Sequence, residues 1–194
     1  TLISASAVGY YGRRGEELLE EDAAPGSGFL TEVCQAWEDA AKPAERAGVR
    51  VVLLRTGLAL SPAGGALRQM LLPFNMGLGG RLGSGKQYMS WIDLDDLIGL
   101  IHHVLFSDTL SGPVNATAPS PVTNSTFSAA LGRVLGRPTL VPVPSLAVKA
   151  VFGQLGTEAL LSGQRVVPRK AIDSGFHFFY ESIEESLQFQ LGCE

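Results

Sequence analysis

A strand–helix–strand succession near the start of the chain constrains the fold more than any other feature. Residues 2–8 form a short apolar run that ends in small side chains, as in a buried parallel strand that opens into a loop. Residues 29–47 have helical spacing, with Phe29 and Trp37 on one face. Residues 49–55 are β-branched and almost continuously apolar. This order predicts a parallel βαβ unit of an α/β protein.

The first strand also indicates how much of such a domain the chain contains. A buried parallel strand needs neighbours on both faces and both edges, yet residues 2–8 open the sequence. We therefore expect the chain to begin partway through a Rossmann-like, doubly wound parallel sheet. The glycine-rich loop that binds a dinucleotide's phosphates would then lie outside the 194 residues.

The rest of the pattern predicts a smaller, mixed and mainly helical substrate lobe. We assign residues 1–60 to the back half of the nucleotide-binding domain and residues 61–140 to the substrate lobe with interleaved elements. Residues 141–194 form a small C-terminal domain in this interpretation. Helices are expected at residues 66–74, 93–106, 125–135, 146–152, 158–161 and 183–191.

Composition excludes several classes of function. Hydrophobic residues make up 45% of the chain and charged residues 18%, a balance typical of globular proteins. No apolar run reaches the roughly 20 residues of a membrane span, and the start does not resemble a secretory signal, so we expect a cytoplasmic protein without a membrane partner. A net charge of −4 argues against nucleic acid as a partner. Cys34 and Cys193 belong to no metal-type cluster, so we expect reduced thiols and no metal.

Several motifs carry a resemblance to a known family. Residues 4–12, Ser-Ala-Ser-Ala-Val-Gly-Tyr-Tyr-Gly, resemble the strand-to-loop element of extended short-chain dehydrogenase/reductases, the nucleotide-sugar epimerase and dehydratase group. Residues 49–55 and 83–96 resemble later landmarks of that group. A narrower resemblance points to an atypical branch, named epimerase-family protein or putative cell-division inhibitor, with a C-terminal domain of unknown function; it rests on residues 29–38, 70–74, 77–80 and 140–188.

The chain departs from the larger group at its proton-transfer pair. Active members carry Tyr-x-x-x-Lys followed by a glutamate, and the lysine lowers the pKa of the tyrosine that transfers the proton. If Glu38 takes the place of that glutamate, the lysine position falls on Cys34 and the tyrosine position on Leu30. Neither residue can replace the pair. The resemblance implies that the narrower branch lacks the pair as well.

The resemblance also implies where a cofactor would lie. It places Ser6 beside the nicotinamide and makes Ser6 and Tyr10 the candidate catalytic residues. The alternatives are a serine that satisfies strand-end backbone groups and an aromatic loop anchor. Ser6, Thr56, Leu58 and Ala59 are the candidate cofactor contacts, although the last three positions are also compatible with plain packing.

The glycine-rich residues 77–85 suggest a substrate-side flap. They match neither the dinucleotide fingerprint nor the phosphate loop of nucleotide triphosphatases. Arg81 and Lys86 are the candidate contacts to an anionic substrate group, with Trp91 beneath them. Trp91 is also compatible with a core position, because an indole is usually buried.

Other polar residues are open to structural roles. Arg55 either forms an ion pair that orients a loop or contacts an anion. His102 and His103 lack carboxylates at metal spacing. A small basic patch is more typical of a solvated surface than of a partner site; it comprises Arg165, Arg169 and Lys170.

Two functions remain open at this stage. The first is an NAD(P)-dependent epimerase/dehydratase-like or reductase-like protein that binds NADP, or NAD, only together with the missing front part, and that acts on a small-molecule or nucleotide-linked substrate. The second is a non-catalytic cofactor-binding sensor or interaction module, such as a cell-division regulator. A homodimer is compatible with either. A pocket where Ser6 and a tyrosine converge would favour the enzyme, and an apolar pocket would favour the binder.

Overall fold

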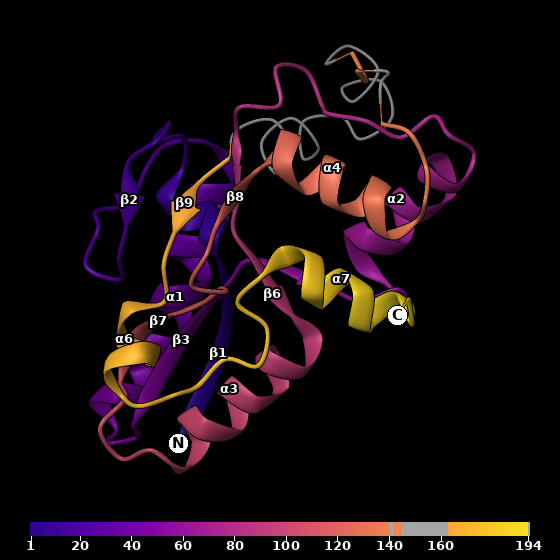
Figure 1. Ribbon diagram of the computed structural model, residues 1–194. Helices are drawn as coiled ribbons and strands as arrows, with labels where there is room; N and C mark the ends of the chain where they lie inside the picture. Colours follow the sequence, from indigo (N-terminus) through magenta and orange to yellow (C-terminus); the bar gives the residue numbers. More distant parts are fainter. Residues whose placement is uncertain (140–141, 145–162, 194) are drawn as a thin grey trace.

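A parallel sheet with a helix on each face and a helical lobe make up the described part of the chain. The computed structural model describes residues 1–139, 142–144 and 163–193 (Figure 1). The helices expected at residues 146–152 and 158–161 lie outside these ranges. The α/β fold class is confirmed.

A three-stranded parallel sheet forms the first part, in the order β1 (Leu2–Ala7), β3 (Val51–Thr56), β7 (Gly112–Ala116). Its register aligns Ser6 with Arg55 and Arg55 with Asn115, so that three polar residues form a row across the sheet. This row lies near the carboxyl ends of the strands, where ligands of open α/β sheets bind.

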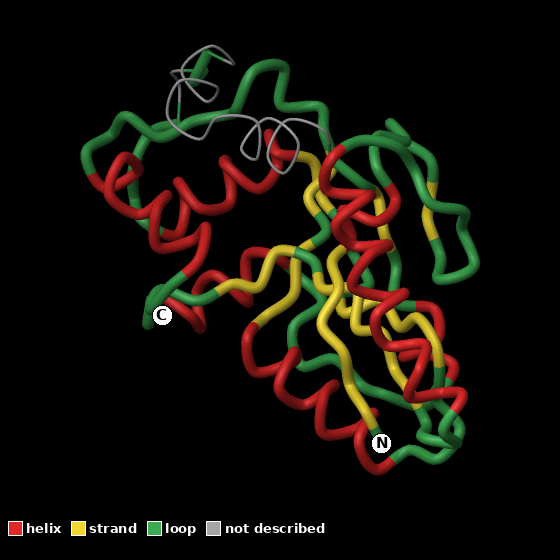
Figure 2. Tube along the Cα trace, turned by 180° about the vertical axis from the view of Figure 1, so that it is seen from behind, coloured by secondary structure: helices red, strands yellow, loops and turns green. Residues whose placement is uncertain are grey.

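Helices α1 (Phe29–Arg46) and α3 (Leu94–Phe106) cover opposite faces of this sheet (Figures 1 and 2). Val52 and Leu54 of β3 pack in a core cluster with Leu100 and Val104 of α3. Because side chains alternate along a strand, Arg55 points to the other face, where it meets α1.

The buried face of α1 differs from its apolar stripe. Phe29 and Trp37 remain 47% and 51% exposed. The buried side chains include Cys34 and Glu38 instead. The charge of Glu38 is buried because Arg55 binds it bidentately.

The helical lobe surrounds a second core cluster that includes Trp91, Phe127 and Leu187. Its helices are α2 (Gly65–Asn75), α4 (Asn124–Val134) and α7 (Ile183–Leu191). The short strands β4 (Leu58–Leu60) and β6 (Trp91–Asp93) pair in parallel and connect this lobe to the sheet.

Two further strand pairs and two short helices complete the described elements. Strand β5 (Tyr88–Met89) pairs antiparallel with β8 (Val122–Thr123), and β2 (Leu18–Leu19) pairs in parallel with β9 (Arg165–Val166). The 3-10 helix η1 (Val8–Tyr11) follows β1, and α6 (Arg169–Asp173) follows β9. Among the described helices, none has the length and apolar character to cross a membrane.

Candidate functional site

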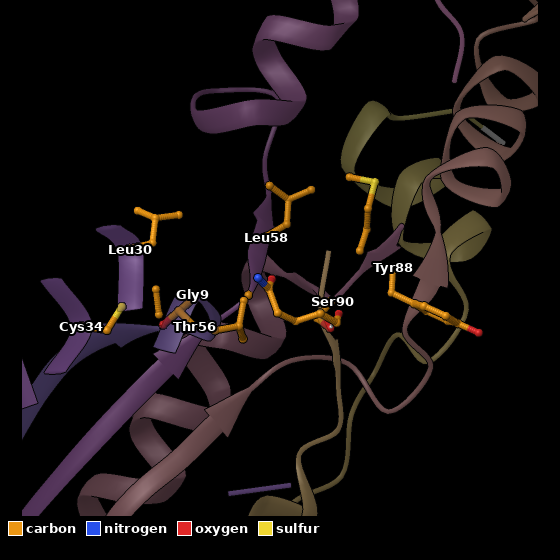
Figure 3. Close-up of a pocket in the computed structure, with 12 residues that line it drawn as sticks. Gly9, Leu30, Cys34, Thr56, Leu58, Tyr88 and Ser90 are labelled. Carbon is orange, nitrogen blue, oxygen red and sulfur yellow. Dashed lines mark hydrogen bonds between the residues drawn. The ribbon is translucent and has the colours of Figure 1, made fainter. Parts of the chain in front are cut away.

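A cavity of about 270 Å³ lies at the carboxyl ends of β1 and β3 (Figure 3). Its position is the one where parallel α/β sheets bind ligands. The lining combines three segments of the sheet region with the β5 segment and the residue before β9. It comprises Ala7, Val8, Gly9, Leu30, Cys34, Thr56, Gly57, Leu58, Tyr88, Met89, Ser90 and Gln164.

Leu30 and Cys34 form one wall of this cavity (Figure 3). They lie one helical turn apart on α1, so their side chains share a face. Gly9 lets the 3-10 helix approach this wall closely, since a Cβ atom there would lie 3.1 Å from the Cβ atom of Leu30. Burial raises the pKa of the Cys34 thiol, so this wall holds a neutral thiol and an aliphatic side chain.

Ser6 is held in a buried polar network next to the cavity. Its hydroxyl donates to Oε1 of Glu38 at 2.8 Å. The Arg55 guanidinium donates to both oxygens of the same carboxylate, at 2.8 and 2.9 Å. Ser6 is therefore engaged with Glu38 and is not among the residues that line the cavity.

The two tyrosines of η1 pack against the same arginine. The Arg55 guanidinium lies 3.5 Å from the centre of the Tyr10 ring. The Tyr11 hydroxyl donates to Asn115 at 2.7 Å and accepts from Arg55 at 2.9 Å. Burial raises the pKa of Tyr11 to about 12. This geometry agrees with an aromatic anchor at Tyr10 and an ion-pair role for Arg55, and neither tyrosine lines the cavity.

The remaining candidate cofactor contacts divide between the cavity and the core. Thr56 and Leu58 line the cavity. Ala59 packs instead against the core cluster between β3 and α3. In this region the cavity lining thus runs from Thr56, the last residue of β3, to Leu58, the first residue of β4.

The candidate substrate contacts lie elsewhere. Arg81 and Lys86 are exposed and lie outside the cavity lining. Trp91 is fully buried in the second core, and its indole nitrogen donates to the carbonyl of Ser120. The glycine-rich segment packs on the start of α4, because a Cβ atom at Gly85 would lie 2.1 Å from the side-chain oxygen of Ser125.

The sequence did not predict the far wall of the cavity. Residues 88–90, which are β5 and the residue after it, and the residue before β9 form this wall. Ser90 and Gln164 line this wall although 74 positions separate them. The Ser90 hydroxyl donates to the carbonyl oxygen of Gln164 at 2.7 Å and accepts from the amide of Val166 at 2.9 Å. Figure 3 shows the ring of Tyr88 directed away from Leu30, with its hydroxyl outermost. A contact of this range leaves no local signal in the sequence.

The described residues hold no group of three His, Cys, Asp or Glu side chains that could bind a metal ion. Arg55 and Glu38, the charged side chains of the network next to the cavity, form an ion pair with each other. The cavity lining, as far as residues 1–139, 142–144 and 163–193 form it, contains no Asp, Glu, Lys, Arg or His.

Comparison with known proteins supports the resemblance found in the sequence. An epimerase family protein of Mycobacterium bovis is 50% identical over 189 residues, which cover 97% of this chain and 63% of that protein. Mouse epimerase family protein SDR39U1 is 40% identical over 189 residues, which cover 96% of this chain and 64% of that protein. Over its length, this chain matches the epimerase family. The chain spans less than two thirds of the length of these relatives. A family model described as a domain of unknown function (DUF1731) matches residues 143–189.

Solved structures show the same fold. Human epimerase family protein SDR39U1 (isoform 2), solved with NADPH, matches with a TM-score of 0.92 and 35% identity over 98% of this chain and 64% of that one. A nucleoside-diphosphate sugar epimerase from Corynebacterium glutamicum matches with a TM-score of 0.81 and 37% identity, over 99% of this chain and 37% of its own. The Rossmann-like fold of the epimerase family is thereby confirmed for the part that the chain spans.

Proposed function

We propose that this chain forms the substrate side, and part of the nicotinamide side, of an NADP(H)-dependent reductase or epimerase-like protein. The observation that carries the proposal is the cavity at the carboxyl ends of β1 and β3. The NADPH in the human relative's structure supports NADP over NAD. The activity of the whole protein is part of the proposal, since the chain spans 63% of the Mycobacterium bovis relative.

The residues of the cavity fit a nicotinamide ring. Gly9 leaves space beside Leu30 that a Cβ atom would narrow, and Thr56 and Leu58 would hold the ring from the end of β3. An apolar wall of this kind suits an aromatic ring, and the described cavity has a volume of about 270 Å³. When bound, the cofactor would supply a hydride.

The chain's own residues would orient the reactants and exclude water rather than transfer a proton. Leu30 cannot donate a proton, and burial raises the pKa of Cys34, which keeps the thiol neutral and weakly acidic. The described part of the lining holds no carboxylate, lysine or histidine. The proton of a reduction would then come from water, and we expect slower chemistry than in relatives with a tyrosine–lysine pair.

A cofactor fragment tests this assignment directly on the chain. Reduced nicotinamide mononucleotide is titrated into protein with labelled Leu and Val methyl groups, and methyl NMR spectra are recorded. We expect shifts for Val8, Leu30 and Leu58 and none for Leu131, which lies in the second core.

A matched pair of β1 variants controls this titration. Ala7→Leu fills the cavity edge and should abolish the shifts, whereas Ala5→Leu, on an exposed position of the same strand, should leave them unchanged. If the three cavity methyl groups fail to shift, the cavity is not the nicotinamide site.

The second candidate is a cofactor-binding protein without turnover. The network that engages Ser6 and Tyr10 supports it, because neither side chain lines the cavity. A chimera that supplies the part of the Mycobacterium bovis relative outside the match separates the candidates. A reductase would consume NADPH, measured at 340 nm, with small ketones, and a sensor would bind NADPH without consuming it.

A cytoplasmic location, a homodimer and a small-molecule or nucleotide-linked substrate remain parts of this proposal. The half-exposed Phe29 and Trp37 on α1 support self-association. Light scattering at increasing protein concentration would measure it, and Trp37→Lys should shift a dimer towards monomer.

A further inference from the structure

One polar side chain in the cavity has no partner. Gln164 is 8% exposed and lines the cavity. Within the described part of the chain, its backbone carbonyl accepts from Ser90, while its side-chain amide makes no hydrogen bond. Among the described residues, the buried side-chain atom without a partner is Arg165 Nε, so the Gln164 amide still reaches solvent. A ligand in the cavity that replaces this solvent would take over the hydrogen bonds of the amide.

Three of the other polar side chains of the lining are accounted for, and the hydroxyl of the fourth, Tyr88, is directed away from Leu30 (Figure 3). The Ser90 hydroxyl makes two hydrogen bonds to the segment that carries Gln164. The Thr56 hydroxyl donates within its own strand, to the carbonyl of Leu54 at 3.4 Å. Burial keeps the Cys34 thiol neutral by raising its pKa. Among the described lining residues, Gln164 is thus the buried side chain whose amide can hydrogen-bond a ligand.

The backbone around Gln164 is fixed by packing on β5. Gly163 has a φ of 59°, and a Cβ atom there would lie 2.7 Å from the backbone nitrogen and oxygen of Tyr88. Only glycine allows this approach. Together with the two hydrogen bonds of Ser90, this contact holds in place the backbone that carries the amide.

The chemistry of the lining restricts the ligand. Among the described residues that line the cavity, none carries a charge, so these residues offer no counter-charge to a buried carboxylate or phosphate. A side-chain amide both donates and accepts. It can donate Nε2–H to a ketone oxygen, and its Oε1 can accept from the hydroxyl of the corresponding alcohol.

We propose that Gln164 is the substrate-recognition residue of this cavity and that the substrate is a small, uncharged, mainly apolar ketone or its secondary alcohol. The substrate class rests on the proposed function, in which this cavity is the reaction site. Because one amide can hydrogen-bond both the ketone and its secondary alcohol, substrate and product could occupy the same position.

Cyclohexanone is a suitable probe, because it joins an apolar body to one carbonyl oxygen. It is titrated into the 15N-labelled chain, and the side-chain amide signals of Gln164 are followed by NMR. We expect these signals to shift and Gln164→Leu to weaken binding about fivefold to tenfold, as for the loss of one hydrogen bond. The control Gln188→Leu, on an exposed position of α7, should bind as the native chain does.

Two measurements separate recognition from a structural role. Because the amide is unpaired, Gln164→Leu should keep or raise the melting temperature, whereas the loss of a structural hydrogen bond would lower it. Gln164→Asn retains the amide on a shorter side chain and should fold while binding cyclohexanone more weakly. A lowered melting temperature for Gln164→Leu together with unchanged ketone binding would overturn the proposal.

Competing ligands give the remaining outcomes. Tighter binding of cyclohexanecarboxylate than of cyclohexanone would overturn the uncharged substrate class. A loss of nicotinamide binding in Gln164→Leu without loss of ketone binding would assign the amide to the cofactor's carboxamide and also overturn it. If reduced nicotinamide mononucleotide binds and cyclohexanone does not, this inference alone fails. If the ketone binds at Gln164 and the mononucleotide does not, the proposed function fails while the carbonyl site stands.

Discussion

At the scale of single residues, a buried network centred on Arg55 fixes the geometry beside the cavity. Arg55 binds Glu38 bidentately, contacts both tyrosines of η1 and reaches the carbonyl of Glu21. Asn115 continues the network from the neighbouring strand. These contacts tie α1, η1, β3 and β7 together, so the position of Leu30 and Cys34 depends on them.

The ion pair at the centre of this network gives the first prediction. Glu38→Leu leaves the Arg55 charge buried and unpaired, and we expect it to lower the free energy of unfolding by about 3–5 kcal/mol. The double variant Glu38→Leu/Arg55→Met removes both charges and should be more stable than Glu38→Leu alone. Urea unfolding of the three proteins measures both effects. A double variant less stable than the single one would contradict a simple charge-pair role.

Tyr11 gives a prediction about pH. Its pKa is raised by burial from 10.0 to about 12. A folded pKa above the unfolded value means that the stabilisation is complete below pH 10 and is lost as the pH rises from 10 to 12. Urea unfolding at pH 9 to 12, with phenolate absorbance at 295 nm, should show this loss in the native chain. The loss should be smaller in Tyr11→Phe, and equal slopes in both proteins would contradict the assignment.

Sequence reasoning placed some of these residues and not others, for physical reasons. The resemblance to the reductase group pointed to Leu30 and Cys34, through its tyrosine and lysine positions, and the structure brings both residues to the cavity wall. Ser6 and Tyr10 face a buried charge pair whose existence depends on two elements packing together. Gln164 reaches the cavity only through a contact across 74 positions, which no local pattern contains.

At the scale of elements, local signals predicted the longer helices and the main strands. Residues 183–191 were expected to be helical and form α7, and residues 125–135 correspond to α4, with Thr123 as its cap. The strand expected at residues 49–55 is β3, shifted by one or two residues. The two-residue strands β2, β5, β8 and β9 were not predicted, because each exists only through its pairing with a distant segment.

The first turn of α3 gives a third prediction. Asp93 is fully buried and accepts from the amide of Asp95, from Ser186 at 2.6 Å and from Gln190 at 2.9 Å. Asp93→Ala removes the cap and leaves two α7 donors unpaired, so we expect a loss of about 2–4 kcal/mol in thermal or urea unfolding.

The cap of α4 is the matched control. Thr123 makes one cap bond, to the amide of Thr126 at 3.2 Å, at an exposed site. Thr123→Ala should lower the free energy of unfolding by only about 1 kcal/mol. Equal losses in the two variants would mean that Asp93 does not link α3 to α7.

At the scale of the whole molecule, Gly57 marks one of the places where the chain passes between the two parts of the fold. Strand β3 belongs to the three-stranded sheet and β4 to the pair with β6, and Gly57 lies between them. Its amide donates to the carbonyl of Ala116, and the next amide, of Leu58, donates to the carbonyl of Ser90. The chain therefore passes from one sheet to the other beside the cavity, which explains why both walls of the cavity are fixed relative to each other.

Gly57 allows this passage because it has no side chain. A Cβ atom there would lie 2.3 Å from the carbonyl oxygen of Ser90 and 3.0 Å from the side chain of Thr117. The nearest atom belongs to the backbone, so it cannot move without displacing the segment that also holds Gln164 through Ser90. We expect Gly57→Ala to lower the free energy of unfolding by about 1–3 kcal/mol, measured in urea, and to shift the NMR signals of the Gln164 amide. Gly64→Ala, in an extended conformation with open space around it, should change neither quantity by much. If Gly57→Ala were destabilising but left the Gln164 signals in place, the two walls of the cavity would be held by separate contacts, and the substrate wall would be independent of the sheet that carries the nicotinamide wall.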